Sequence, residues 1–150
     1  MDTKQLLKSL KENNVNFVII GGAAVIAHGL VRTTKDLDIF VEPTRENVER
    51  LFKALQNVGY DLQDTTVEEA LQKKILFRKY ILELDIHPFA AGVRFETLWQ
   101  NKVPLKLCDE TVYFSSLEDL IKMKKAAGRN VDLEDLKYLE EVQKQLKKKK

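Results

Sequence analysis

The feature that most constrains the fold is the uninterrupted apolar run Phe-Val-Ile-Ile at residues 17–20. A short run of this kind, rich in β-branched residues, is typical of a strand that is covered on both faces. Leucines at helical spacing precede it and predict a helix over residues 3–13. With 150 residues, of which 44% are hydrophobic, the chain can bury one sizeable core. We therefore expect an α/β (α+β) fold with a small mixed β-sheet flanked by helices.

The rest of the chain alternates between strand and helix patterns. Further strands are predicted over residues 36–41, 75–78, 80–87, 103–107 and 111–114. Further helices are predicted over residues 23–28, 45–57, 67–71, 115–127 and 132–146, with a helical turn over 96–100. In the last helix, the residues expected on the inner face are Leu133, Leu136, Leu139 and Val142. We expect a core over residues 1–114 and a C-terminal helical pair over 115–150 that packs on it, in one structural domain.

Composition excludes several classes of protein. The formal net charge is +2, and a lysine run fills residues 147–150, so the rest of the chain is slightly acidic. This balance gives no support for nucleic-acid binding. The single cysteine, Cys108, excludes an internal disulfide and a multi-cysteine zinc site, and we expect it to be buried in a strand. The sequence shows no signal peptide and no apolar stretch of the roughly 18 residues that a membrane span needs, so a cytoplasmic protein without a membrane partner is expected.

Asp36 and Asp38 are the first candidate site residues. Residues i and i+2 of a strand point to the same face, so both carboxylates project together from the strand predicted over 36–41. Two carboxylates side by side in a largely apolar strand repel each other and are costly to desolvate. A divalent cation such as Mg²⁺ relieves both costs. The alternative is structural, with Asp36 at a strand edge and Asp38 in solvent.

Two further patterns point to the same site. Gly21 and Gly22 follow the first strand at the start of a helix, where free backbone N–H groups bind phosphate, although glycine pairs also form ordinary turns. In a later predicted strand, alternation puts Glu83, Asp85 and His87 on one face. If the two acidic strands are neighbours in the sheet, a third carboxylate reaches the metal. Three carboxylates around a metal, beside a phosphate cradle, suit phosphoryl transfer.

Together these motifs resemble the signature of the nucleotidyltransferase superfamily that includes DNA polymerase β. The resemblance is carried by the glycine pair, by the run RTTKDLDI at residues 32–39, and by Asp85 between apolar neighbours. It is closer to the small bacterial and archaeal members, among them AbiEii toxin-like proteins and antibiotic nucleotidyltransferases. A pattern over residues 119–132 is similar to one that these proteins carry after the core, and the likeness covers about residues 5–145.

The resemblance implies a metal site with three carboxylates. Asp36 and Asp38 would ligate Mg²⁺, or Mn²⁺ in its place, bridging the phosphates of an NTP. Asp85 would complete the metal site and act as the base that activates an acceptor hydroxyl. Glu83 is a second candidate for the third carboxylate, and Asp85 is preferred because it lies between apolar neighbours.

The resemblance also implies a nucleotide site and a reaction. Gly21 and Gly22 would hold the triphosphate. The superfamily usually has Gly-Ser at this point, so with Gly22 the phosphate is held by the backbone alone or with help from Arg32 or Lys35. The reaction would be transfer of NMP from an NTP to a hydroxyl of a small molecule, a protein or RNA, with release of pyrophosphate.

The sequence leaves other functions and partners open. A non-catalytic module that senses nucleotide or binds a partner, for example a toxin–antitoxin component, is the second functional class. An RNA-binding protein is the third class and the weakest, because the body of the chain is slightly acidic. An acceptor pocket has to come from residues 88–100, from the C-terminal helices or from a second subunit, so a homodimer is also an open expectation.

Four more residues have an expected place. His87 shares a face with Asp85 and is a candidate for the edge of the site. Lys124 is expected on a solvated helix face, with contact to nucleotide or acceptor as the alternative. Arg129 and Asp132 are expected to cap adjoining helix ends and brace the last two helices, with contact of Arg129 to nucleotide or acceptor as the alternative.

Overall fold

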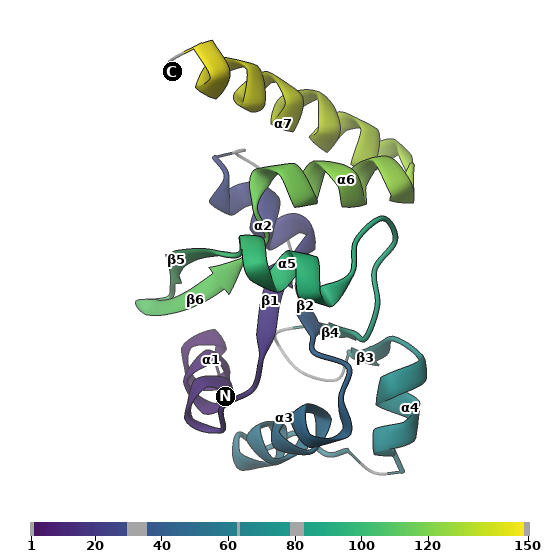
Figure 1. Cartoon of the computed structure of the whole chain (residues 1–150). Coiled ribbons are helices and arrows are strands. Elements are labelled where there is room, and N and C mark those ends of the chain that lie inside the picture. Colours follow the sequence, from purple (N-terminus) through teal and green to yellow (C-terminus); the bar gives the residue numbers. More distant parts are fainter. Residues whose placement is uncertain (1, 30–35, 63, 79–82, 149–150) are drawn as a thin grey trace.

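Figure 1 shows the computed structural model of the chain, in which helices lie above and below a central sheet. The structure describes residues 2–29, 36–62, 64–78 and 83–148. Within these residues, six strands form one mixed sheet and seven helices flank it, which confirms the expected fold class. In the same ranges, none of the helices combines the length and the apolar composition that crossing a membrane requires.

The central strands of the sheet carry the acidic motifs. The strands are β1 (Phe17–Ile20), β2 (Asp36–Val41), β3 (Ile75–Phe77), β4 (Glu83–His87), β5 (Val103–Leu107) and β6 (Glu110–Phe114). They lie in the order β3-β4-β2-β1-β6-β5. The pairs β1–β6 and β2–β4 are parallel, and the other neighbours are antiparallel. All four residues of β1 are buried, as predicted for a strand covered on both faces.

The helices lie close to their predicted positions. They are α1 (Thr3–Glu12), α2 (Gly21–Ala27), α3 (Arg45–Asn57), α4 (Val67–Gln72), α5 (Phe95–Asn101), α6 (Leu117–Ala127) and α7 (Asn130–Lys148). Side-chain caps explain several of the starting points, because Asp2, Thr44, Thr66 and Ser116 each accept a hydrogen bond from a backbone N–H of the first turn. Three helices start two residues from the predicted position: α2 and α7 begin two residues early, and α6 begins two residues late.

The C-terminal helical pair shares the core of the sheet. Gly128 ends α6 in the left-handed conformation, with φ of 65°, and α7 then packs along α6 at the top of Figure 1. Leu120 and Ile121 of α6 and Leu139 of α7 belong to the same buried cluster as the residues of β1 and β2. Leu133, which was expected on the inner face of α7, is instead 45% exposed, so that prediction is wrong. A division between residues 1–114 and 115–150 stays a prediction.

Cys108 is not the buried strand residue that the sequence suggested. It lies exposed in the two-residue connection between β5 and β6. Cys108 and Asp109 both have positive φ, 51° and 65°, as a tight hairpin turn of type I′ requires. Cys108 therefore forms part of the turn that follows β5, and the expectation of a buried strand position is wrong.

Candidate active site

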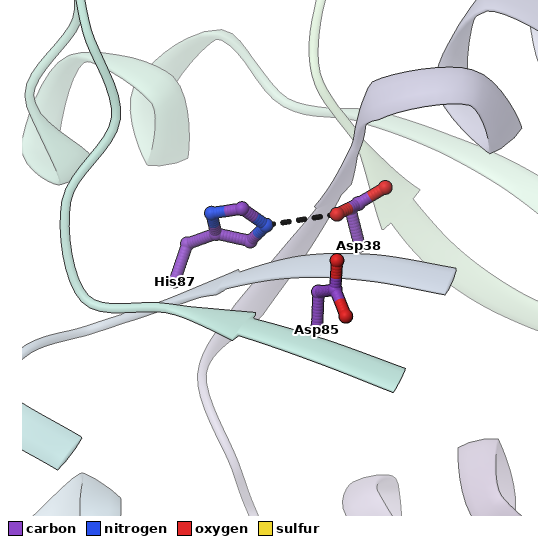
Figure 2. Close-up of side chains that lie close together, drawn as sticks. All are labelled: Asp38, Asp85 and His87. Carbon is purple, nitrogen blue, oxygen red and sulfur yellow. Dashed lines mark hydrogen bonds and ion pairs between the residues drawn. The ribbon is translucent and has the colours of Figure 1, made fainter. Parts of the chain in front are cut away.

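The acidic side chains meet because of the register between β2 and β4. In this parallel pair, Asp36 lies opposite Glu83, Asp38 opposite Asp85, and Phe40 opposite His87. The alternation of the strands therefore brings Asp36, Asp38, Asp85 and His87 to one face of the sheet. Figure 2 shows Asp38, Asp85 and His87 pointing toward one another. One ligand atom from each of these three lies within 4.8 Å of the other two.

The two carboxylate oxygens of Asp38 have different surroundings. Nε2 of His87 lies 2.8 Å from Oδ1, the contact drawn as a dashed line in Figure 2. The other oxygen, Oδ2, lies against Gly21, where a Cβ atom would come within 2.5 Å of it. Gly21 also has φ of +70°, a conformation that other residues adopt at a cost. The first glycine of the pair thus makes room for the Asp38 carboxylate at the start of α2.

Arg78 forms an ion pair with Asp85. Its Nη1 donates to Oδ1 of Asp85, whose side chain is only 7% exposed. This hydrogen bond is the main reason why the pKa of Arg78 is raised above its ordinary value. The Nε atom of Arg78 also lies 3.8 Å from Oε2 of Glu83. Asp85 borders the cavity beside Asp36 and Asp38, whereas Glu83 is not among the described residues that line it.

A cavity of about 520 Å³ lies between the acidic face of the sheet and the helical pair. On the sheet side it is bordered by Gly21, Asp36, Asp38, Asp85 and His87. The rest of the lining consists of Ile20, Lys74, the loop residues Phe89, Ala90 and Ala91, and, from the helical pair and its connection, Leu120, Met123, Lys124, Ala127, Arg129, Val131 and Asp132. The cavity thus has an acidic wall on the sheet side, a second wall from the helical pair that carries Lys124 and Arg129, and a further cation at Lys74.

The cations of the second wall are held by two buried carboxylates. Nζ of Lys124 lies 3.1 Å from an oxygen of Asp132 and 3.1 Å from one of Asp135. Nε of Arg129 lies 2.7 Å from Oδ2 of Asp132, a contact that spans three residues at the start of α7, whereas the ion pairs that join the two helices are those of Lys124. Lys124 is 6% exposed, so its expected place on a solvated face is wrong. Its spacing from Asp132 and Asp135 across the break at Gly128 could have indicated the ion pair.

Of the four residues predicted to bind the nucleotide, the structure describes Gly21 and Gly22. Gly21 borders the cavity, while Gly22 is buried in α2. Arg32 and Lys35 lie outside the described residues. Arg78 was missed, because its position follows from the antiparallel pairing of β3 with β4, in which Leu76 lies opposite Asp85. Residue spacing alone does not reveal that pairing.

The donor set fits a divalent metal ion. Carboxylate oxygens suit Mg²⁺ and Mn²⁺, and the additional imidazole is a ligand that Mn²⁺ accepts more readily than Mg²⁺. The space at Gly21, which a Cβ would fill, leaves Oδ2 of Asp38 accessible at the border of the cavity. Among the described residues, Asp38, Asp85 and His87 have ligand atoms close enough together to hold an ion, and Asp36 borders the same cavity.

Structures of antibiotic-modifying enzymes share this fold. The lincosamide antibiotic adenylyltransferase LnuA, solved with lincomycin bound, superposes with a TM-score of 0.62 at 18% identity, covering 95% of this chain and 98% of that one. ANT(2'')-Ia in complex with adenylyl-2''-tobramycin gives a TM-score of 0.61 at 17% identity over 93% and 90% of the two chains. The solution structure of the antibiotic-resistance factor ANT(2'')-Ia gives 0.60 at 16% identity over 91% and 79%. At these identities the similarity establishes the fold.

The sequence comparison identifies the family. No curated protein matches the chain at a significant level. The family described as nucleotidyltransferase of unknown function, DUF6036, matches residues 1–147, which is nearly the whole chain. The resemblance drawn from the glycine pair and the aspartates is thereby confirmed at the level of the superfamily. The chain belongs to the DUF6036 family of nucleotidyltransferases.

Proposed function

We propose that this nucleotidyltransferase transfers a nucleoside monophosphate from an NTP to a hydroxyl group of a small acceptor molecule. The observation that carries the proposal is the register of β2 and β4, which gathers Asp36, Asp38 and Asp85 at one side of a cavity of about 520 Å³. Cavities of this size hold small-molecule ligands. The adenylyltransferase fold of LnuA and ANT(2'')-Ia supports the same class of reaction.

In the proposed reaction, the acceptor oxygen attacks the α-phosphorus of the NTP. A new P–O bond forms to the acceptor, the bond from the α-phosphorus to the α–β bridging oxygen breaks, and pyrophosphate leaves. Asp85 takes the proton of the acceptor hydroxyl, and Arg78 holds this carboxylate in place through its other oxygen. Mg²⁺ or Mn²⁺ bound to the three aspartates would supply charge stabilisation at the phosphate oxygens.

Radiolabelled nucleotides test the proposal. The protein is incubated with each α-labelled NTP, with Mg²⁺ or Mn²⁺ and with a panel of hydroxyl compounds; transfer of the label to the acceptor is measured, and released pyrophosphate is measured separately by an enzyme-coupled assay. The Asp36→Asn, Asp38→Asn double variant is expected to reduce release to background. Asp109→Asn, which makes the same chemical change in the exposed β5–β6 turn, is the matched control and is expected to retain full activity.

Two results would contradict the proposal. Turnover that survives in the double variant would show that the aspartates do not form the reaction centre. Tight, metal-dependent NTP binding without pyrophosphate release in the presence of any acceptor would instead favour a nucleotide-sensing module.

A further inference from the structure

The helical pair places a restrained guanidinium opposite the acidic wall of the cavity. Arg129 and Asp132 line the cavity together with Asp36, Asp38 and Asp85. Three hydrogen bonds join Arg129 to the Asp132 carboxylate. Its backbone N–H donates to Oδ2 at 3.2 Å, Nε donates to Oδ2 at 2.7 Å, and Nη2 donates to Oδ1 at 3.2 Å. These contacts fix one edge of the guanidinium.

The other edge of the guanidinium remains available to a ligand. Among the residues that the structure describes, none accepts a hydrogen bond from Nη1 of Arg129, and the side chain is 71% exposed. An arginine fixed along one edge loses little further side-chain entropy when its free N–H groups bind an anion, so it is preorganised for phosphate oxygens.

Asp132 is itself fixed from the opposite side. Lys124, buried in α6, lies between Asp132 and Asp135, with both Nζ–O distances at 3.1 Å. These buried contacts keep the Asp132 carboxylate in position when a ligand binds to Arg129. Asp132 and Lys124 are thus positioning residues for the guanidinium.

A bracing role alone does not explain the position of Arg129. The pairs that Lys124 forms with Asp132 and Asp135 already join the two helices in the interior. An ion pair with so exposed an arginine adds little to stability. Arg129 instead lines the same cavity as Asp36 and Asp38, so it can contact a ligand that also reaches those carboxylates.

We infer that Arg129, oriented by Asp132 and Lys124, binds the β- and γ-phosphates of the nucleoside triphosphate. The inference rests on the proposed function and makes it more specific. The α-phosphate reacts at the acidic wall in the proposed transfer, and the guanidinium binds the far end of the phosphate chain. The site therefore recognises the triphosphate chain, and a monophosphate lacks the groups that Arg129 binds.

Calorimetry with three probes tests this assignment. Binding of ATP, inorganic tripolyphosphate and AMP is measured with Mg²⁺ for the full chain and for Arg129→Gln. The loss of charge-assisted hydrogen bonds is expected to weaken ATP and tripolyphosphate about 10- to 100-fold. AMP binding is expected to change little. In steady state, the KM for ATP is expected to rise more than kcat falls.

Two further variants separate ligand binding from damage to the fold. Lys125→Gln removes a neighbouring exposed charge that does not line the cavity, and we expect it to bind all three probes as the unchanged chain does. Arg129→Lys keeps the charge but not the two-point contact with Asp132, and intermediate affinity for tripolyphosphate is expected. Thermal melting of each variant checks the fold, and Arg129→Lys remains informative if Arg129→Gln does not fold.

The outcomes distinguish this inference from the proposed reaction. Unchanged tripolyphosphate affinity in Arg129→Gln and Arg129→Lys would overturn the inference, as would an equal loss for AMP. If that result came with normal pyrophosphate release, the proposed reaction would stand without Arg129. If tripolyphosphate binding depends on Arg129 but no acceptor supports release of pyrophosphate, the inference stands and the proposed transfer fails.

Discussion

Asp38 is the residue on which the candidate site depends most closely. His87 contacts one of its oxygens, and Gly21 leaves space for the other. A carboxylate with one oxygen restrained presents the second to a metal in a defined direction. His87 therefore contributes by contacting the Asp38 carboxylate, and Gly21 contributes because it has no side chain beside that carboxylate.

Gly21→Ala is expected to abolish nucleotide transfer. The added Cβ would lie 2.5 Å from Oδ2 of Asp38, so the carboxylate has to move away from its position. The measurement is pyrophosphate release at saturating NTP and metal. Gly59→Ala is the matched control, because Gly59 also has positive φ, +94°, but has nothing within 4 Å of the added atom. We expect it to lose about 1 kcal/mol of stability and no activity. Equal activity of the two variants would contradict this account.

His87→Ala is expected to weaken metal binding by about 10- to 100-fold, because Asp38 loses the contact that orients it. The affinity for Mn²⁺ is measured by electron paramagnetic resonance, with a non-hydrolysable NTP analogue present. His87→Gln is expected to retain most of the affinity, since its amide can donate to the same oxygen. His28→Gln provides a comparison, as His28 contacts the backbone oxygen of Ser115, outside the cavity. An unchanged affinity in His87→Ala would show that Asp38 does not need this contact.

The sequence predicts the acidic residues better than their supporting residues. Asp36, Asp38 and Asp85 follow from the period of a strand, which is a local property. Arg78 depends on the register between β3 and β4, and Lys124 depends on how α6 packs on α7. These are tertiary contacts, so local spacing gives only weak information about them.

At the scale of elements, the junction between α6 and α7 is expected to give the protein a pH-dependent stability. Burial alone would raise the pKa of the Asp132 carboxyl, but hydrogen bonds from Arg129 and Lys124 outweigh burial and lower it below its ordinary value of 3.8. The stabilisation is therefore complete well above pH 3.8 and is lost as the pH falls through the lower folded value. Urea unfolding between pH 6 and pH 3 is expected to show a smaller decrease for Asp132→Asn than for the unchanged chain.

The same substitution is expected to cost about 3 kcal/mol at neutral pH, because it leaves buried Lys124 with only one of its two carboxylates. Asp109→Asn, which makes the same chemical change in an exposed turn, serves as the control, and the steepness of its decrease between pH 6 and pH 3 is expected to match that of the unchanged chain. Parallel curves for Asp132→Asn and the unchanged chain would argue against a lowered pKa at Asp132.

The β5–β6 turn offers a stabilising change. Cys108 and Asp109 both adopt positive φ, which Asn and Gly tolerate best. The double substitution Cys108→Asn, Asp109→Gly is expected to raise the free energy of unfolding by about 0.5–1 kcal/mol. Cys108→Val is expected to lower it, since a β-branched residue resists this conformation. Urea midpoints measure both changes, and a double variant no more stable than the original would refute the assignment of the turn.

Elements with a strong local signal were predicted most closely. Each of the helices α3 and α6 begins beside a capping residue, Thr44 or Ser116, that the sequence shows plainly. The inner face of α7 was harder to predict, because Leu133 and Leu139 both have the period of a buried face, yet only Leu139 is buried.

For the whole molecule, the predicted division at residue 114 can be tested by a fragment. Leu120, Ile121, Met123 and Leu139 from the helical pair are buried in the common core. A fragment of residues 1–114 would expose the surfaces that these side chains cover. We expect it to unfold without a cooperative transition and to give a poorly dispersed NMR spectrum. Cooperative unfolding would instead show that residues 1–114 form an independent unit.

The placement of the cavity has a consequence during translation. The strands β2 and β4 that carry the carboxylates leave the ribosome before α7 does, and the cavity needs residues from all three elements. A nascent chain can therefore assemble the acidic sheet while one wall of the site is still missing. On the proposed function, catalytic competence is gained only once α7 has been synthesised, and a translation product that stops before α7 does not consume nucleotide.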